Sequence, residues 1–124
     1  MSLVLIIDDD SVVREAIKDI LELIDVEVIC AANGPDGIKA YKENRERVDG
    51  IIIDRRMPLL DGMATIQELR KIQTDIPIIM SSGYADEDLM QSQNLNQEKP
   101  NAYLCKPYEI DDLIQLVEQL ILKQ

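Results

Sequence analysis

Hydrophobic residues along the chain follow two alternating patterns. Five short, continuous apolar runs, most of them rich in β-branched residues, are typical of parallel strands buried on both faces. Between these runs, apolar residues recur at steps of three and four, which predicts helices with one apolar face. The predicted strands are Leu3–Ile7, Val26–Ala32, Ile51–Ile53, Ile76–Met80 and Ala102–Cys105.

The helical pattern is clearest after the first, third and fifth strands. Acidic residues open the last of these helices and Lys123 lies near its end, as the helix dipole favours. The apolar positions are Val13, Ala16, Ile17, Ile20 and Ile24 in the first helix, Met63, Ile66, Leu69 and Ile72 in the third, and Ile110, Leu113, Ile114, Val117, Leu120 and Ile121 in the last.

Two further helices are expected from weaker signals. Proline is favoured at the first position of a helix, so a helix should begin near Pro35 and run to about Glu46. Within residues 86–101 large apolar residues are sparse, and we expect a short or frayed helix there, followed by a loop through Pro100.

The alternation of strand and helix determines the expected fold. Strand and helix alternate five times, and right-handed crossovers then give an α/β fold: a single, doubly wound, five-stranded parallel sheet covered on both faces. A chain of 124 residues has the usual size of one domain, so residues 1–124 are expected to form a single unit.

Composition narrows the possible functions. The 13 basic and 24 acidic residues give a net charge of −11, which makes nucleic acid a poor partner, and the absence of His excludes a histidine general base. Cys30 and Cys105 lie far apart in apolar runs and are expected to be buried free thiols, as in a reducing compartment. No apolar run approaches the length of a membrane span and no signal sequence opens the chain, so a cytoplasmic location without a membrane partner is expected.

Acidic residues follow two of the predicted strands. The first strand ends in Asp8, Asp9 and Asp10, and the third ends in Asp54. Ligands of open α/β folds bind at the carboxyl edge of the sheet, and the first and third strands of such a sheet are normally neighbours. Asp8, Asp9 and Asp54 should therefore converge in one pocket. Their carboxylates repel one another there unless a cation neutralises them, and all-oxygen ligands suit Mg²⁺ or Mn²⁺. Asp10, beside Ser11, is expected to cap a helix or face solvent.

Two other strand ends complement this cluster. Ser82 closes the fourth strand and offers a hydroxyl group, and Lys106 closes the fifth and offers an ammonium group for an oxyanion. A lone serine or lysine at a strand end is usually solvated, so it is their joint placement beside the acids that matters. A carboxylate nucleophile, a metal site, a hydroxyl and an ammonium together indicate phosphoryl transfer to an aspartate.

Four motifs stand in order along the chain: Leu5–Asp10, Ile53–Pro58 followed by Asp61–Gly62, Pro77–Gly83, and Tyr103–Pro107. In this order and at this spacing they resemble the receiver domain of two-component response regulators over essentially the whole chain. The resemblance implies a flavodoxin-like (βα)5 fold with strand order 2-1-3-4-5 and a cis peptide between Lys106 and Pro107.

The resemblance also implies roles for individual residues. Asp54 would accept a phosphoryl group from a phosphohistidine on a histidine kinase or histidine phosphotransfer protein. The protein would catalyse only this self-phosphorylation and its own dephosphorylation, and would not be a conventional enzyme. Asp8, Asp9, Asp54 and the backbone carbonyl of Arg56 would hold magnesium, while Ser82 and Lys106 would bind phosphoryl oxygens. Phosphorylation would then draw Ser82 inward, let Tyr103 turn, and change the surface formed by the fourth helix, fifth strand and fifth helix.

Three features either depart from the usual family pattern or are expected to modulate the site. Arg56 is long and cationic where many relatives are smaller or neutral, so it could alter how water reaches the phosphoryl group. Gly83 leaves the mouth of the pocket without a side chain. The run Asn94–Asn101 replaces the Gly-Ala pair that usually precedes the fifth strand.

Other functions remain as alternatives. Asp8–Val12 also fits the opening motif of haloacid-dehalogenase-type phosphatases, with Asp8 as nucleophile and Asp10 as acid/base, although Asp54 is then unexplained. A receiver fold that acts as an interaction module without phosphorylation is a second alternative. The chain ends soon after the fifth helix, so output is expected from a partner or from covalently linked kinase or effector domains outside this sequence.

Overall fold

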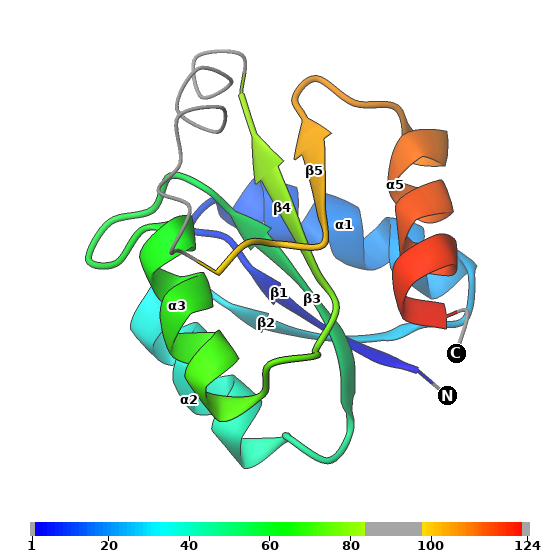
Figure 1. The fold of residues 1–124 in the computed structure, drawn as a ribbon. Helices are drawn as coiled ribbons and strands as arrows, with labels where there is room; N and C mark the ends of the chain where they lie inside the picture. Colours follow the sequence, from blue (N-terminus) through cyan, green and yellow to red (C-terminus); the bar gives the residue numbers. More distant parts are fainter. Residues whose placement is uncertain (1, 84–97, 123–124) are drawn as a thin grey trace.

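The computed structural model describes residues 2–83 and 98–122, which form one sheet flanked by helices (Figure 1). All neighbouring strands pair in parallel, in the order β2-β1-β3-β4-β5. The doubly wound sheet and its strand order are therefore confirmed. The strands are β1 (Leu3–Ile7), β2 (Glu27–Ala31), β3 (Val48–Asp54), β4 (Ile78–Ser82) and β5 (Ala102–Cys105).

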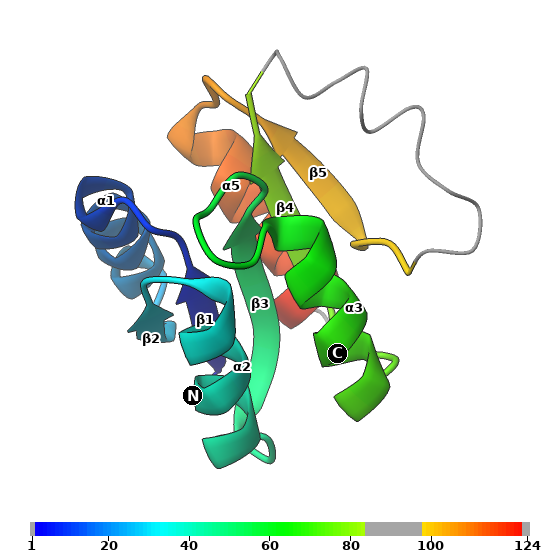
Figure 2. The same cartoon turned by 90° about the vertical axis from the view of Figure 1, so that its left-hand side faces the viewer.

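Helices cover both faces of the sheet (Figure 2). The helices α1 (Ser11–Leu23) and α5 (Ile110–Val117) pack on one face, and α2 (Gly34–Glu43) and α3 (Gly62–Ile72) pack on the other. The helix α5 continues as a π-helical turn, Glu118–Leu122. The helix expected within residues 86–101 falls largely on 84–97, outside the described residues. Within the described ranges, no helix combines the length and the apolar character needed to cross a membrane.

The core consists of two layers, one on each face of the sheet. Successive strand residues point to opposite faces, so Leu5 and Ile7 pack toward α2 and α3, whereas Val4 and Ile6 pack toward α1 and α5. Every residue of β1 is buried, as the continuous apolar run predicts for a central parallel strand.

Polar caps fix where the helices begin, and hence where the loops at the carboxyl edge of the sheet end. The carboxylate of Asp10 accepts hydrogen bonds from the N–H groups of Val12 and Val13, which confirms Asp10 as a helix cap. Asn33 caps α2 and Asp61 caps α3 in the same way. Such caps satisfy N–H groups that have no partner within the helix.

Some boundaries differ from the prediction. The helix α2 ends at Glu43 rather than Glu46, because Asn44 donates its side-chain amide to the carbonyl of Ala40, and its own carbonyl accepts from Arg47 and Val48 as the chain turns into β3. The strand β3 begins three residues before the apolar run that predicted it, since polar Asp49 and small Gly50 interrupt the pattern.

The prediction of buried cysteines was wrong. Cys30 lies on β2 and Cys105 on β5, and both residues are exposed. These are the two edge strands of the sheet, which have a neighbour on one side only. Their residues are therefore less completely covered than those of the central strands, although the sequence pattern is equally apolar.

Candidate functional site

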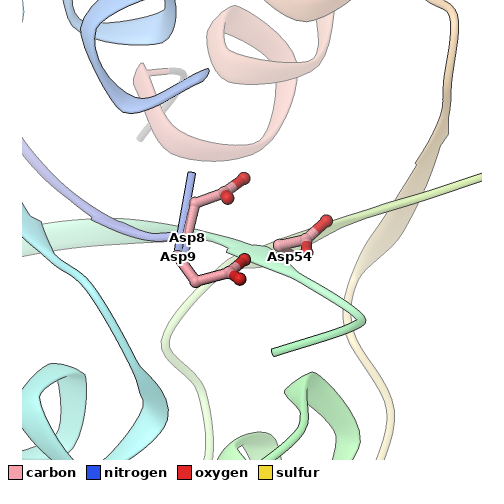
Figure 3. Close-up of side chains that lie close together, drawn as sticks. All are labelled: Asp8, Asp9 and Asp54. Atoms are coloured by element: carbon pink, nitrogen blue, oxygen red, sulfur yellow. The ribbon is translucent and has the colours of Figure 1, made fainter. Parts of the chain in front are cut away.

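Three carboxylates meet at the carboxyl edge of the sheet (Figure 3). Asp8 and Asp9 follow β1 directly, and Asp54 is the last residue of the neighbouring strand β3. One ligand oxygen from each of the three lies within 4.8 Å of the others. The predicted convergence is thus confirmed, because adjacent parallel strands end at the same level.

The backbone holds Asp8 in place. Its N–H donates to the carbonyl of Ala31 at 3.1 Å, which extends the pairing of β1 with β2 by one residue. Its carboxylate accepts from the N–H of Asp10 at 2.9 Å, and the Nη1 of Arg14 donates to its carbonyl at 2.7 Å. The side chain of Arg14 on α1 therefore secures the end of β1, a role that the sequence pattern did not suggest.

Burial and charge work against each other at Asp8. This residue is 2% exposed. Burial raises the pKa of the Asp8 carboxyl to about 6, the Asp10 N–H opposes the shift, and the nearby charge of Asp54 adds to it. Keeping Asp8 ionised at neutral pH is therefore costly unless positive charge is brought close to it.

Lys106 supplies one such charge. Its Nζ lies 2.9 Å from the Oδ1 of Asp54, and both side chains are mostly buried. Burial would lower the pKa of Lys106, but its hydrogen bond to Asp54 and the charges of Asp54 and Asp8 outweigh this, so the pKa lies above its ordinary value. The lysine thus remains an ammonium group. The peptide between Lys106 and Pro107 is cis, as expected.

Two serines at the end of β4 lie near this pair. Ser82, the hydroxyl that the sequence singled out, is buried, and its carbonyl accepts from the N–H of Lys106 at 2.7 Å. The preceding residue, Ser81, pairs in register with Asp54 and its Oγ lies 3.4 Å from the Oδ1 of Asp54. Sequence analysis missed Ser81, although the register of β3 against β4 would have indicated it.

The loop between β3 and α3 closes tightly beneath Asp54. The N–H of Gly62 donates to the carbonyl of Arg55 at 2.8 Å. A Cβ atom at Gly62 would lie 2.5 Å from the carbonyl oxygen of Asp54, so only glycine allows this approach. The loop is thereby fixed directly behind the cluster.

The remaining predicted residues are less buried than Asp8 and Asp54. Arg56 is exposed in the loop after Asp54, and Tyr103 on β5 is half-buried against the core layer beneath α2 and α3. A Cβ atom at Gly83 would meet no atom of the described residues within 4 Å.

Comparison with known proteins settles the family. The family model of the response regulator receiver domain matches residues 4–118. The chain belongs to this family. A probable C4-dicarboxylate response regulator, DctR of Bacillus subtilis, is 33% identical to the receiver domain over 118 residues, which cover 94% of the present chain and 50% of DctR. The chain spans about half the length of the first curated relatives that it matches.

Solved structures agree with the receiver fold. A receiver domain protein from Clostridium thermocellum is 31% identical, with a TM-score of 0.88 and coverage of 99% of this chain and 96% of the other. The receiver domain of the sensor histidine kinase PA1611 from Pseudomonas aeruginosa is 27% identical, with a TM-score of 0.83 and 97% coverage of both chains; its structure has a magnesium ion coordinated in the active-site cleft. The receiver domain is therefore a signalling module of two-component systems.

The acid cluster of this receiver domain has the composition of a magnesium site. Asp8, Asp9 and Asp54 offer only carboxylate oxygens, which suit a hard divalent cation, and Asp9 is exposed where solvent can reach it. Burial raises the pKa of Asp8, so a cation held close to this carboxylate would favour its ionised form. Within residues 2–83 and 98–122 this is the one group of three acidic, thiol or imidazole side chains close enough to share an ion.

Proposed function

We propose that residues 1–124 form a receiver domain that accepts a phosphoryl group on Asp54, in a Mg²⁺-dependent reaction, from a phosphohistidine. The donor would be a histidine kinase or a histidine phosphotransfer protein. The observation that carries the proposal is the position of the Asp54 carboxylate, 2.9 Å from the Lys106 ammonium and within 4.8 Å of Asp8 and Asp9.

The chemistry divides among these residues. An Asp54 carboxylate oxygen attacks phosphorus, a P–O bond forms, and the P–N bond breaks with its electron pair passing to the imidazole of the donor. Lys106 compensates charge on the phosphoryl oxygens, and the Ser82 hydroxyl donates to one of them. Magnesium, held by Asp8, Asp9, Asp54 and the Arg56 carbonyl, would supply further charge compensation. Positioning and charge neutralisation account for most of the catalysis.

Signalling would follow from the same residues. When Ser82 moves toward the phosphoryl group, Tyr103 can occupy the space beside it, and the surface of β5 and α5 changes; the fourth helix expected before β5 lies largely outside the described residues. Tyr103 is partly buried at the edge of the core, which is consistent with a side chain that has two packing positions. Partner domains that read this surface would lie elsewhere in a longer protein or on another chain.

The structure does not favour the phosphatase alternative. In that reaction Asp10 would act as the acid/base, but its carboxylate caps α1 through the N–H groups of Val12 and Val13. The position of Asp54 beside Lys106 would also have no role. An interaction module that is never phosphorylated would likewise leave this pair without a purpose.

Phosphate incorporation at Asp54 tests the proposal. The protein is incubated with acetyl phosphate and Mg²⁺, and its intact mass and the modified peptide are determined. We expect wild type, Asp10→Asn and the surface control Asp19→Asn to gain one phosphoryl group, and Asp54→Asn to gain none. Label on Asp8, or undiminished incorporation by Asp54→Asn, would instead support the phosphatase arrangement and overturn the proposal.

A further inference from the structure

Ser81, near the end of β4, faces Asp54 from the side of the sheet that α1 and α5 cover. Ser81 and Asp54 pair in register, as do Ile79 and Ile52, two residues earlier on the same strands. Both isoleucines belong to the core layer beneath α1 and α5. Because side chains two residues apart on a strand point to the same face, Ser81 and Asp54 share this face. The next residue, Ser82, points to the other face, so the two serines cannot exchange roles.

Backbone pairing and burial hold the Ser81 hydroxyl close to the Asp54 carboxylate. The carbonyl of Ser81 accepts from the N–H of Arg55 at 2.9 Å, and the residue is only 1% exposed. Its Oγ lies 3.4 Å from the Oδ1 of Asp54, a long hydrogen bond in which the hydroxyl donates, since a carboxylate only accepts. In residues 2–83 and 98–122, Asp54 is the one hydrogen-bond partner of this hydroxyl.

Lys106 donates to the same oxygen, but its position is not fixed in this way. Its Nζ lies 2.9 Å from the Oδ1 of Asp54, and its side chain is 35% exposed. In the proposed function, the flexible ammonium group turns to the phosphoryl oxygens once Asp54 is phosphorylated. The short side chain of Ser81 cannot follow. Ser81 is therefore the donor that stays on the Asp54 carboxyl group after phosphorylation.

We propose that Ser81 promotes hydrolysis of the aspartyl phosphate by stabilising Asp54 as the leaving group. This inference rests on the proposed function. In hydrolysis a water oxygen attacks phosphorus and forms a new P–O bond, while the bond between phosphorus and the Asp54 oxygen breaks. The electron pair of the broken bond returns to the Asp54 carboxylate, and one proton of the water passes to the phosphate product. Negative charge thus develops on Asp54 as the reaction proceeds.

The hydrogen bond from Ser81 strengthens as this charge develops. A hydroxyl binds an ionised oxygen more tightly than the neutral acyl group of an aspartyl phosphate. An interaction that is stronger in the transition state than in the ground state lowers the barrier. Because a carboxylate shares its charge between two oxygens, the argument holds whichever oxygen carries the phosphoryl group. Ser81 accordingly shortens the lifetime of the phosphorylated protein.

Decay of the phosphoprotein tests this role. Wild type, Ser81→Ala and Ser81→Thr are phosphorylated with acetyl phosphate and Mg²⁺, the donor is removed at constant Mg²⁺, and the remaining phosphoprotein is followed by intact mass. We expect at least about threefold slower decay in Ser81→Ala, because a hydrogen bond to the charged leaving group is lost. Ser81→Thr keeps the hydroxyl and should return toward the wild-type rate. Equal or faster decay in Ser81→Ala, or equally slow decay in Ser81→Thr, would overturn the inference.

Beryllofluoride binding distinguishes loss of the hydroxyl from general damage to the site. This phosphoryl mimic bonds to the Asp54 carboxylate, so losing a donor that favours the free carboxylate should leave its affinity for Ser81→Ala equal to wild type or higher. Weaker binding would indicate a distorted site and would also overturn the inference. The surface control Asp19→Asn should match wild type in both measurements.

The two proposals fail in different ways. If wild type incorporates phosphate at Asp54 but Ser81→Ala decays at the wild-type rate, only the role of Ser81 is refuted. If wild type incorporates no phosphate at Asp54, the proposed function is refuted, and the role of Ser81 is refuted with it.

Discussion

Asp8 is the residue at which folding and function conflict most clearly. Its burial raises the pKa of the carboxyl from 3.8 to about 6, so the folded protein binds this proton more tightly than the unfolded chain does. The contribution of Asp8 to stability is therefore complete below about pH 4 and is lost as the pH rises through 6. The folded protein is therefore less stable when the Asp8 carboxylate is ionised and no cation is bound.

This conflict predicts the pH dependence of stability. In EDTA, Asp8→Asn should match wild type near pH 4 and become more stable than wild type at pH 8, by an amount on the order of 3 kcal/mol, because a shift of about two pKa units is removed. Urea unfolding at pH 4, 6 and 8 measures the difference. Asp19→Asn serves as the control for a lost carboxylate, and a constant difference between Asp8→Asn and wild type at all three pH values would refute the explanation.

Arg56 provides a second prediction at this scale. Arg56 is exposed in the loop that follows Asp54, and we expect its side chain to influence how water reaches a phosphoryl group on Asp54. Arg56→Ala should therefore change the lifetime of the phosphorylated protein, measured by the decay of the phosphoprotein after removal of acetyl phosphate. Equal decay rates in the variant and in wild type would exclude this role.

Single residues also show what the sequence could and could not predict. Asp8, Asp9, Asp54 and Lys106 were identified because each follows a recognisable strand, and the structure brings them together. Ser81 was missed because its contact with Asp54 depends on strand register. The exposure of Cys30 was mispredicted, since an apolar run does not reveal which strand lies at the edge of the sheet.

At the scale of elements, the loop between β3 and α3 depends on one close approach. Replacing Gly62 by alanine would place a methyl group 2.5 Å from the Asp54 carbonyl oxygen and 2.8 Å from the Cα of Arg55, and both are backbone atoms that yield only if the loop moves. The geometry of Asp54 and the position of α3 are coupled through this contact.

Gly62→Ala should accordingly destabilise the protein by about 1–3 kcal/mol, the usual cost of overpacking, and weaken its binding of beryllofluoride with Mg²⁺. Gly83→Ala is the matched control, because a Cβ atom there meets no atom of the described residues within 4 Å, and it should change stability by less than about 0.5 kcal/mol. Urea unfolding and amide-shift titration supply the two measurements. Similar losses in both variants would show that the close approach at Gly62 is not the cause.

Element boundaries were predictable where hydrophobic periodicity reached the end of the element. The predicted first and fifth strands agree with β1 and β5 at both ends. The end of α2 was placed three residues too late, because the side chain of Asn44 stops the helix through a hydrogen bond to Ala40 that hydrophobic periodicity does not describe. Local polar contacts rather than the apolar pattern determine such ends.

At the scale of the whole molecule, the sheet order turns distant sequence segments into one site. The carboxyl ends of β1 and β3 are adjacent only because the chain reverses its direction of winding after β2, and the side chain of Lys106 reaches Asp54 from the far edge strand, β5. The fold class was predictable from the alternation of strands and helices, and the strand order followed from the resemblance of the motifs to those of receiver domains.

The central claim is that the three acids of the cluster share one divalent cation. Calorimetric titration with MgCl₂ at pH 7.5 tests it most directly, with amide shifts recorded on the same samples to locate the ion. We predict one bound Mg²⁺ per chain, shifts centred on residues 8, 9 and 54, near-complete loss of binding in Asp8→Asn and full retention in Asp19→Asn. Unchanged binding in Asp8→Asn, or shifts scattered over the acidic surface, would contradict the account.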